Sequence, residues 1–270
     1  MRSKSEAALA WIVDTWDALL RERQTNAVDF SEEIFSLADV IQDNPSVLAA
    51  LEDASRDTGD RVELATNLFQ GKVSGQVLEL LEGIVRERWA QSGDLLIALE
   101  TIGVQTVLAS AQLDDALSKT EEELYQCLRM LKRERDLRLT LNSQQHPVAA
   151  RAQLVRKVFA NVNPYTQALL VRSVSHTKQS SLTAVIARYI DQASERGKHL
   201  VASVTAAIPL STEQEERLRS ILCRYYNQDV KLHIALDPTI VGGLRIHIGD
   251  DLIDGTLASR IADVKEVFSK

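Results

Sequence analysis

Two histidines near the C-terminus have residue types and a spacing that could do chemistry. His233 and His247 each stand in a short stretch where apolar and polar residues alternate, which predicts two half-buried strands. If these strands pair as a hairpin with Leu236 opposite Leu244, the two imidazoles face each other. They could share a zinc ion, but a closed zinc site needs about four ligands and no others are evident. A solvated cross-strand pair is therefore the favoured interpretation.

A glycine-rich stretch is the second pattern that could do chemistry. Gly242-Gly243 and the later Gly249-Asp250-Asp251 could form a phosphate cradle. However, no helix is expected to begin there, so the positive helix end that would hold a phosphate is missing. Turn glycines are the favoured interpretation. The sequence contains no P-loop, dinucleotide-binding glycine motif or nucleophile elbow. We expect no catalytic residue, cofactor site or metal site, and predict that the chain is not an enzyme.

Composition and charge narrow the function classes. The chain has 31 Lys and Arg against 38 Asp and Glu, a net charge of −7, which disfavours nucleic acid as a partner. No run of about 18 apolar residues is evident, so no direct membrane insertion is expected. Cys127 and Cys223 provide neither metal spacing nor a disulfide framework. The 11 Gly and 5 Pro in 270 residues favour long helices.

The elements that must position these residues are clearest in the last seventy positions. A strand is expected at 200–205, and a doubled capping box at 211–215 predicts the start of a helix. The apolar face of that helix is expected to hold Leu218, Ile221, Leu222 and Tyr225. Alternation predicts strands at 230–236 and 244–248, and a final helix follows on Leu257, Ile261, Val264 and Phe268. The predicted order is β-α-β-β-α, a small α+β domain.

A series of residues in this region carries a family resemblance. In order, they are Pro209, Leu210, Asp237, Pro238, Gly242, Gly243, Leu244, Ile246, Gly249, Asp254, Gly255, Leu257 and Arg260. Their order resembles the C-terminal region of the δ subunit of bacterial F-type ATP synthases, whose mitochondrial counterpart is the oligomycin-sensitivity-conferring protein. The resemblance implies that these residues shape the domain and its partner surface.

The resemblance implies a function without catalysis. Such a subunit belongs to the stator: it ties the catalytic head to the peripheral stalk, so that proton-driven rotation yields ATP. The implied partners are the N-terminal segments of the α subunits and the b-type stalk subunit. The implied location is the cytoplasmic face of the bacterial plasma membrane, peripheral and within the complex. A helical scaffold or adaptor unrelated to ATP synthase is the alternative.

The part before residue 200 shows an internal repeat. The motif R-x-x-L-x-x-x-x-F at Arg61 recurs at Arg151, and Leu51 recurs as Leu141 at the same offset. Two related helical units are therefore predicted; chance matches between leucine-rich helices are the rival interpretation. The length and the second unit resemble the actinobacterial form of the δ subunit. The family's usual Tyr-Ala-x-Ala-Leu motif does not stand near this N-terminus.

These observations predict a mostly α fold, with duplicated helical-bundle units followed by a small C-terminal α+β domain. The expected domains are helical bundle unit one at 1–116, helical bundle unit two at 117–198, and the stalk-binding α+β domain at 199–270.

The charge pattern generates a first prediction. With a net charge of −7 and no basic amphipathic helix, the isolated protein should stay in the supernatant when centrifuged with anionic vesicles at physiological salt. A polybasic peptide that sediments with the same vesicles is the positive control. Sedimentation of the protein itself would contradict the prediction.

Overall fold

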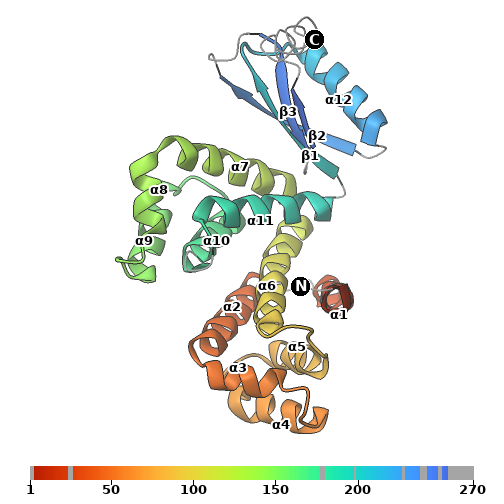
Figure 1. Ribbon diagram of the computed structural model, residues 1–270, viewed down its shortest axis with the longest axis vertical. Helices are drawn as coiled ribbons and strands as arrows, with labels where there is room; N and C mark the ends of the chain where they lie inside the picture. Colours follow the sequence, from red (N-terminus) through yellow and green to blue (C-terminus); the bar gives the residue numbers. More distant parts are fainter. Residues whose placement is uncertain are drawn as a thin grey trace, which may run out of the picture. The chain divides into compact units, whose positions relative to one another are not determined.

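The computed structural model describes residues 3–23, 27–176, 180–197, 199–226, 229–237, 242–248 and 251–254. Its helices (Figure 1) are α1 (Ser3–Arg23), α2 (Ala27–Asp43), α3 (Pro45–Glu52), α4 (Thr58–Phe69), α5 (Gly75–Arg86), α6 (Asp94–Leu113), α7 (Leu117–Arg133), α8 (Arg135–Asn142), α9 (Val148–Val158), α10 (Pro164–Ser173), the short 3-10 helix η1 (Val174–His176), α11 (Leu182–Gly197) and α12 (Thr212–Tyr226). Its strands are β1 (His199–Ala206), β2 (Asp229–Leu236), β3 (Leu244–Ile248) and β4 (Asp251–Asp254). The predicted fold class is confirmed: helices dominate, and the strands follow them.

The chain divides into two compact units. The first unit holds the described residues of Met1–Thr120 and Val148–Ser175, and the second holds those of Glu121–Pro147 and His176–Lys270. Each unit consists of residues that contact one another more than they contact the rest of the chain. The predicted division into helical bundle units at 1–116 and 117–198 and an α+β domain at 199–270 stays a prediction.

Helix order repeats along the chain as the sequence motif does. α2 begins at residue 27 and α7 at 117, α3 at 45 and α8 at 135, and α4 at 58 and α9 at 148. α5 and α10 follow in the same order, and so do α6 and α11. Helix α6 therefore belongs to both sets. It is the last helix of the first set, and it opens the second set in the place that α1 has in the first.

A buried arginine has the same task in both sets. Arg61 donates from Nη1 to the carbonyl oxygens of Leu51, at 3.4 Å, and of Glu87, the residue that caps the C-terminal end of α5, at 3.3 Å. Arg151 donates from Nη1 to the carbonyl oxygen of Val174, which caps the C-terminal end of α10, at 2.8 Å. A cation at these last carbonyls satisfies their unpaired oxygens and favours the helix dipole. The repeated motif thus marks a repeated helix cap.

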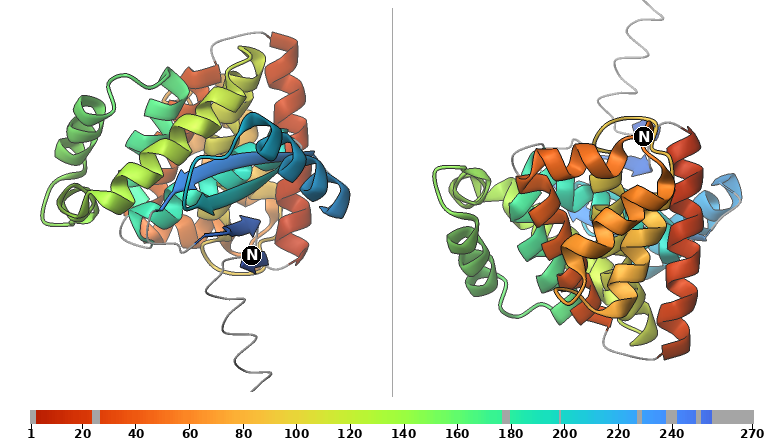
Figure 2. Two further views of the ribbon diagram at one scale, coloured as in Figure 1. Left: turned by 90° about the horizontal axis from the view of Figure 1, so that it is seen from above. Right: turned by 90° about the horizontal axis from the view of Figure 1, so that it is seen from below.

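Helix α6 is the centre of the first unit. It lies between α1 and α2 and also contacts α5 and α10 (Figure 1), whereas α1 is a long straight helix at the edge of its group (Figure 2). Gly103 permits the closest of these approaches, because a Cβ there would lie 2.4 Å from the Phe35 ring of α2. Glycine in a helix interior costs stability, so the close packing of α2 must offset that cost.

Helix α6 also corrects one sequence inference. By length and composition it is apolar enough to cross a membrane, which the search for a long apolar run missed. However, 72% of its most apolar window is buried inside the protein. Enclosure on several sides by other helices requires such an apolar surface, so the same composition fits a core helix.

Arg172 of α10 is buried among side chains of two other helices. Its guanidinium donates to Glu100 of α6 at 2.6 to 3.2 Å and to both carboxylate oxygens of Asp39 of α2 at 2.8 and 2.9 Å. It also stacks on the Phe35 ring, 4.6 Å from the centroid. Burial lowers the pKa of Arg172, but hydrogen bonds and charge from Glu100 and Asp39 outweigh burial and raise it above its ordinary value. One charged side chain therefore links three helices.

The sheet has the strand order β2-β1-β3-β4. β1 pairs in parallel with β2 and antiparallel with β3, and β3 pairs antiparallel with β4. The predicted hairpin between the strands now seen as β2 and β3 is wrong. Because α12 carries the chain back parallel to β1, β2 takes one edge of β1 and leaves the other edge for β3. β4 was not predicted, since its first residue was assigned to a turn.

The Arg172 contacts generate a second prediction. Replacing Arg172 by Met should lower the free energy of unfolding by about 3–5 kcal/mol, because Glu100 is left nearly buried without its cation. Arg86→Met is the control, since Arg86 pairs with Glu82 on an exposed helix face at 3.0 Å; it should cost about 0–1 kcal/mol. Urea unfolding measures both. Equal losses would contradict the assigned role of Arg172.

Candidate functional site

The pairing register gives the sheet one apolar and one polar face. Val204 of β1 stands between isoleucines of β2 and β3, whereas its neighbour Ser203 stands between His233 and His247. Alternate residues of a strand point to opposite faces, so whole rows of side chains share one environment. Helix α12 covers the apolar face, where the core consists of Ala202, Val204, Leu222, Val230, Ile246 and Ile248.

Helix α12 begins as the sequence predicts. The side chain of Gln214 accepts from the backbone N–H of Ser211 at 2.9 Å, and the Ser211 hydroxyl accepts from the N–H of Gln214 at 3.3 Å. This reciprocal capping box satisfies two backbone donors that would otherwise lack partners. It fixes where the helix starts, and so which of its side chains meet the sheet.

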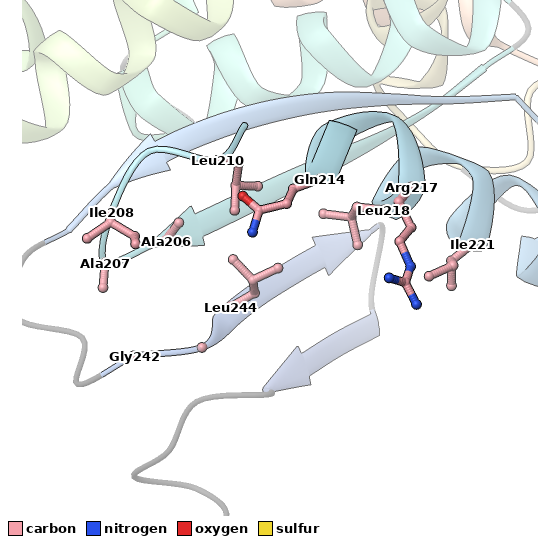
Figure 3. A pocket seen from close by; sticks show the side chains of 11 residues that line it. Ala206, Ala207, Ile208, Leu210, Gln214, Arg217, Leu218, Ile221, Gly242 and Leu244 are labelled. Atoms are coloured by element: carbon pink, nitrogen blue, oxygen red, sulfur yellow. The ribbon is translucent and has the colours of Figure 1, made fainter. Parts of the chain in front are cut away.

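An apolar groove runs between the start of α12 and the start of β3. Its volume is about 600 Å³, and its lining consists of Ala206, Ala207, Ile208, Leu210, Gln214, Arg217, Leu218, Ile221, Gly242, Gly243 and Leu244. Figure 3 shows Leu210 and Leu218 facing Leu244 across this groove. A concave apolar surface with few polar groups is the usual form of a binding site. We call this surface the apolar groove.

Two large apolar side chains of the apolar groove are left in solvent. Ile208 is 72% exposed and Ile221 is 45% exposed. The predicted apolar face of α12 is therefore wrong in part: Leu218 and Leu222 pack on the sheet, but Ile221 and Tyr225 do not. The reason is the helical period. Leu218 and Leu222 are four residues apart on one face of α12, and Ile221 and Tyr225 are four residues apart on the neighbouring face; only the first of these faces meets the sheet.

The residues of the family resemblance fall into several groups. Leu210, Gly242, Gly243 and Leu244 come together in the apolar groove. Ile246 belongs to the core beneath α12, and Pro209 is exposed beside the groove.

Two residues of that series have backbone roles. The N–H of Asp237 donates to the carbonyl of Ala206 at 2.9 Å, and Asp254 pairs with Arg245 across β3 and β4. The remaining residues lie outside the described part of the chain: Pro238, Gly249, Gly255, Leu257 and Arg260. The predicted final helix also lies outside it.

The two glycines at the mouth of the groove have backbones that favour glycine. Gly242 has φ of 72° and Gly243 has φ of 83°. A side chain in this left-handed region meets its own backbone, so other residues rarely adopt it. The interpretation as turn glycines fits these angles.

His233 is buried, so its prediction as a solvated residue is wrong. Its Nε2 and Nδ1 lie 3.6 Å and 3.5 Å from carboxylate oxygens of Glu121 and Glu122 on α7, and its ring packs edge-on against Tyr125 at 4.2 Å between centroids. Glu121 is buried too, although the run Glu121-Glu122-Glu123 in the sequence predicts solvated helix surface. Lys231 donates to Glu121 at 3.3 Å. Lys231, on the polar face of the sheet, thus supplies a countercharge to Glu121 of α7.

His233 and His247 do not form a pair. They lie on opposite sides of Ser203, on strands that are not neighbours, and His247 is exposed. Within the ranges that the structure covers, no group of three or more His, Cys, Asp or Glu side chains could hold a metal ion. His233 and His247, which the sequence analysis considered as one possible metal site, therefore lie in separate environments.

Sequence reasoning misjudged or missed three positions in the first unit. The helical spacing of Trp11 and Trp16 in the sequence predicts that both pack in the core, but Trp11 is 61% exposed, whereas Trp16 is buried at 4% exposure. Gly103 and Arg172 were not singled out. The offset of 90 residues offered no signal for either, because their roles depend on Phe35, Asp39 and Glu100 in other helices.

Comparisons with known proteins agree with the sequence resemblance. The profile of the family described as "ATP synthase delta (OSCP) subunit" matches residues 105–268. A protein of Beutenbergia cavernae named "ATP synthase subunit delta" is 35% identical over 266 residues, which cover 98% of each chain. Proteins of the same name from Streptomyces griseus and Corynebacterium urealyticum are 33% and 31% identical, with 97% of each chain covered.

A solved structure shows a weaker likeness. One chain of a mitochondrial ATP synthase hexamer of Toxoplasma gondii covers 62% of this chain and 95% of its own length, with a TM-score of 0.38 and 18% identity. That similarity is too low to compare arrangements.

The positive φ of Gly243 generates a third prediction. Gly243→Ala should destabilise the sheet by about 1–2 kcal/mol, because alanine resists the left-handed region. Hydrogen exchange of the β3 amides should become faster while α1–α6 stay unchanged. Gly83→Ala is the control: Gly83 has open space around its Cβ position and lies within α5, so alanine there should stabilise by up to about 1 kcal/mol. Unchanged exchange in the Gly243 variant would contradict the strain.

Proposed function

We propose, from the premise that this chain belongs to the ATP synthase delta (OSCP) subunit family, that it holds α-subunit N-terminal segments on its helical part and the end of a b-type stalk on its α+β part. The subunit is a non-catalytic component of the peripheral stalk of F-type ATP synthase, a membrane-associated complex. In a bacterium its place would be the cytoplasmic face of the plasma membrane.

The apolar groove is the observation that carries the stalk assignment. Ile208 and Ile221 leave apolar area in solvent, and a partner that covers them gains about 25 cal/mol for each Å² removed from water. The groove is bounded by a helix and a strand, a shape that accepts one apolar face of a partner helix. We therefore assign it to an amphipathic helical end of the stalk subunit. Gln214 and Arg217 offer that helix polar contacts.

The helical part has its own candidate anchor for the head. Trp11 stands on α1 with 61% of its surface exposed, and exposed tryptophans are frequent hot spots of interfaces. An α-subunit segment that packs along α1 would bury this ring. The three-part division into 1–116, 117–198 and 199–270 belongs to this proposal, with head contacts before residue 199 and the stalk contact after it.

Several modest contacts suit a stator better than one large contact. Torque from the rotor must not separate the head from the stalk, and linked contacts gain strength because each keeps the others at high effective concentration. Separate contacts on helices and on the sheet would provide such linkage.

A groove variant tests the stalk assignment. Ile221→Asp places a charge in the apolar groove and should weaken binding of a soluble stalk-subunit fragment at least about tenfold in isothermal titration. Ser220→Asp adds the same charge one position away, on an exposed part of α12 that does not line the groove, and should leave binding unchanged. Binding of an α-subunit N-terminal peptide should be unaffected by both variants.

Two outcomes would contradict the assignment. Equal affinities of the Ile221→Asp and Ser220→Asp variants would show that the stalk binds elsewhere. A chain cut after Ala193 that binds the stalk fragment as tightly as the full chain would show that the α+β part is not needed for stalk binding.

A further inference from the structure

A second cavity lies on the polar face of the sheet, opposite the apolar groove. All of its lining belongs to the second unit: parts of α7 and α11 on one side, and of β1, β2 and β3 on the other. Its volume is about 680 Å³, within the range of roughly 300–1,000 Å³ that small-molecule sites occupy. We call it the polar cleft. Neither the family resemblance nor the stalk assignment uses it.

Positive charge gathers in the polar cleft although the chain is acidic overall. Arg129 and Lys132 come from α7 and Arg245 from β3, and the imidazole of His247 also lies in the lining. Asp191 is the one carboxylate among the described residues of the lining, and burial raises its pKa above the ordinary value. A chain with a net charge of −7 thus places an excess of cations in one cavity.

Two of these cations have no carboxylate partner among the described residues. Neither Arg129 nor Lys132 forms an ion pair with any residue that the structure describes, whereas nearby Lys231 pairs with Glu121. Their positions follow from the helix period, because residues three apart lie on one face of α7. Like charges held close together repel each other, and an anion between them removes that repulsion.

Hydroxyl groups line the same side of the cleft. The register places Ser203 next to His247 and Thr205 next to Arg245, so both hydroxyls share the face of the cations. Tyr125 of α7 lies beside them and donates from its hydroxyl to the carbonyl oxygen of His233 at 3.4 Å; burial raises the pKa of this hydroxyl against the opposing charge of Arg129. Tyr125 therefore keeps its proton at neutral pH. Guanidinium and hydroxyl donors together are the groups that bind phosphate oxygens.

The remaining wall of the cleft is apolar. Leu128 of α7, Ile190 of α11 and Val201 of β1 lie in the lining. An inorganic ion would leave this wall in contact with water. A ligand with a phosphate at one end and a flat or apolar group at the other would cover both parts of the cavity.

We propose that the polar cleft binds an organic phosphate, with the phosphate held by Arg129, Lys132 and the hydroxyls of β1, and the organic group placed against Leu128 and Ile190. A nucleoside diphosphate has the right size and chemistry. The site lies on the face of the sheet that α12 and the stalk-binding groove do not use, so each assignment can fail without the other.

Isothermal titration of the full chain with ADP, adenosine and inorganic phosphate tests this assignment. ADP should bind, while adenosine and phosphate should each bind at least about tenfold more weakly, because each fills only part of the cleft. Salt at 1 M should weaken ADP binding, since the Debye length falls to about 3 Å.

Matched variants locate the binding. Arg129→Gln with Lys132→Gln should weaken ADP binding at least about tenfold. The control carries Lys72→Gln with Arg88→Gln, which removes two exposed cations elsewhere and should leave ADP affinity unchanged. Ser203→Ala is a milder second variant that keeps all charges and should weaken ADP severalfold. Urea unfolding verifies that each variant is folded.

Three results would overturn the proposal. These are no heat of binding with ADP at millimolar concentration, the same loss of affinity in the Lys72/Arg88 control as in the Arg129/Lys132 variant, and equal affinity for inorganic phosphate and ADP. Binding of the stalk fragment is measured in parallel with the double variant. It should be unchanged, so a loss of ADP binding alone leaves the stalk assignment intact.

Discussion

Burial of α6 is the constraint on which the first unit depends. An apolar helix of twenty residues must be covered on several sides, and α1, α2, α5 and α10 provide that cover. Two features make the cover close. Gly103 removes a side chain where Phe35 approaches, and Arg172 neutralises Glu100, one of the charged residues that α6 carries into the interior. Without that cation, desolvation of the carboxylate would oppose the packing of α6.

The repeated arginine also satisfies buried polar groups. Arg61 and Arg151 each reach a helix C-terminus from within a buried site, and each satisfies carbonyls that have no partner inside their own helix. In each case the arginine, the helix end and the turn between them lie within one set of helices. Packing therefore explains why this motif recurs while the surfaces around it differ.

Strand order decides the character of the second unit. Because β1 is central, its alternating residues set the environment of both neighbours, and the sheet acquires an apolar face for α12 and a polar face toward α7. Ile208, in the loop before α12, and Ile221, on a face of α12 that does not meet the sheet, are left in solvent. The polar face is partly buried by α7, which brings cations and hydroxyls into a cavity. Two different binding surfaces on opposite faces follow from one pairing register.

The sequence by itself determined the local structure. Four features are properties of residues near each other in the chain. They are the helix start at the capping box of Ser211 and Gln214, the alternation in β2 and β3, the positive φ of Gly243, and the repeated motif that begins at Arg61 and at Arg151. The order of residues near the C-terminus also identified the family. These signals are short-range, and the chain keeps them wherever its elements finally pack.

Tertiary structure decided the rest. The placement of β1 between β2 and β3 separated His233 from His247 and buried the first of them against Glu121. Ile221 became a surface residue because a different face of α12 meets the sheet. Gly103 and Arg172 received their roles from the contact of α2 with α6. Such outcomes depend on which elements share an edge or a face. Periodicity within one element cannot specify its neighbours, because the same alternation is satisfied on either side of a central strand.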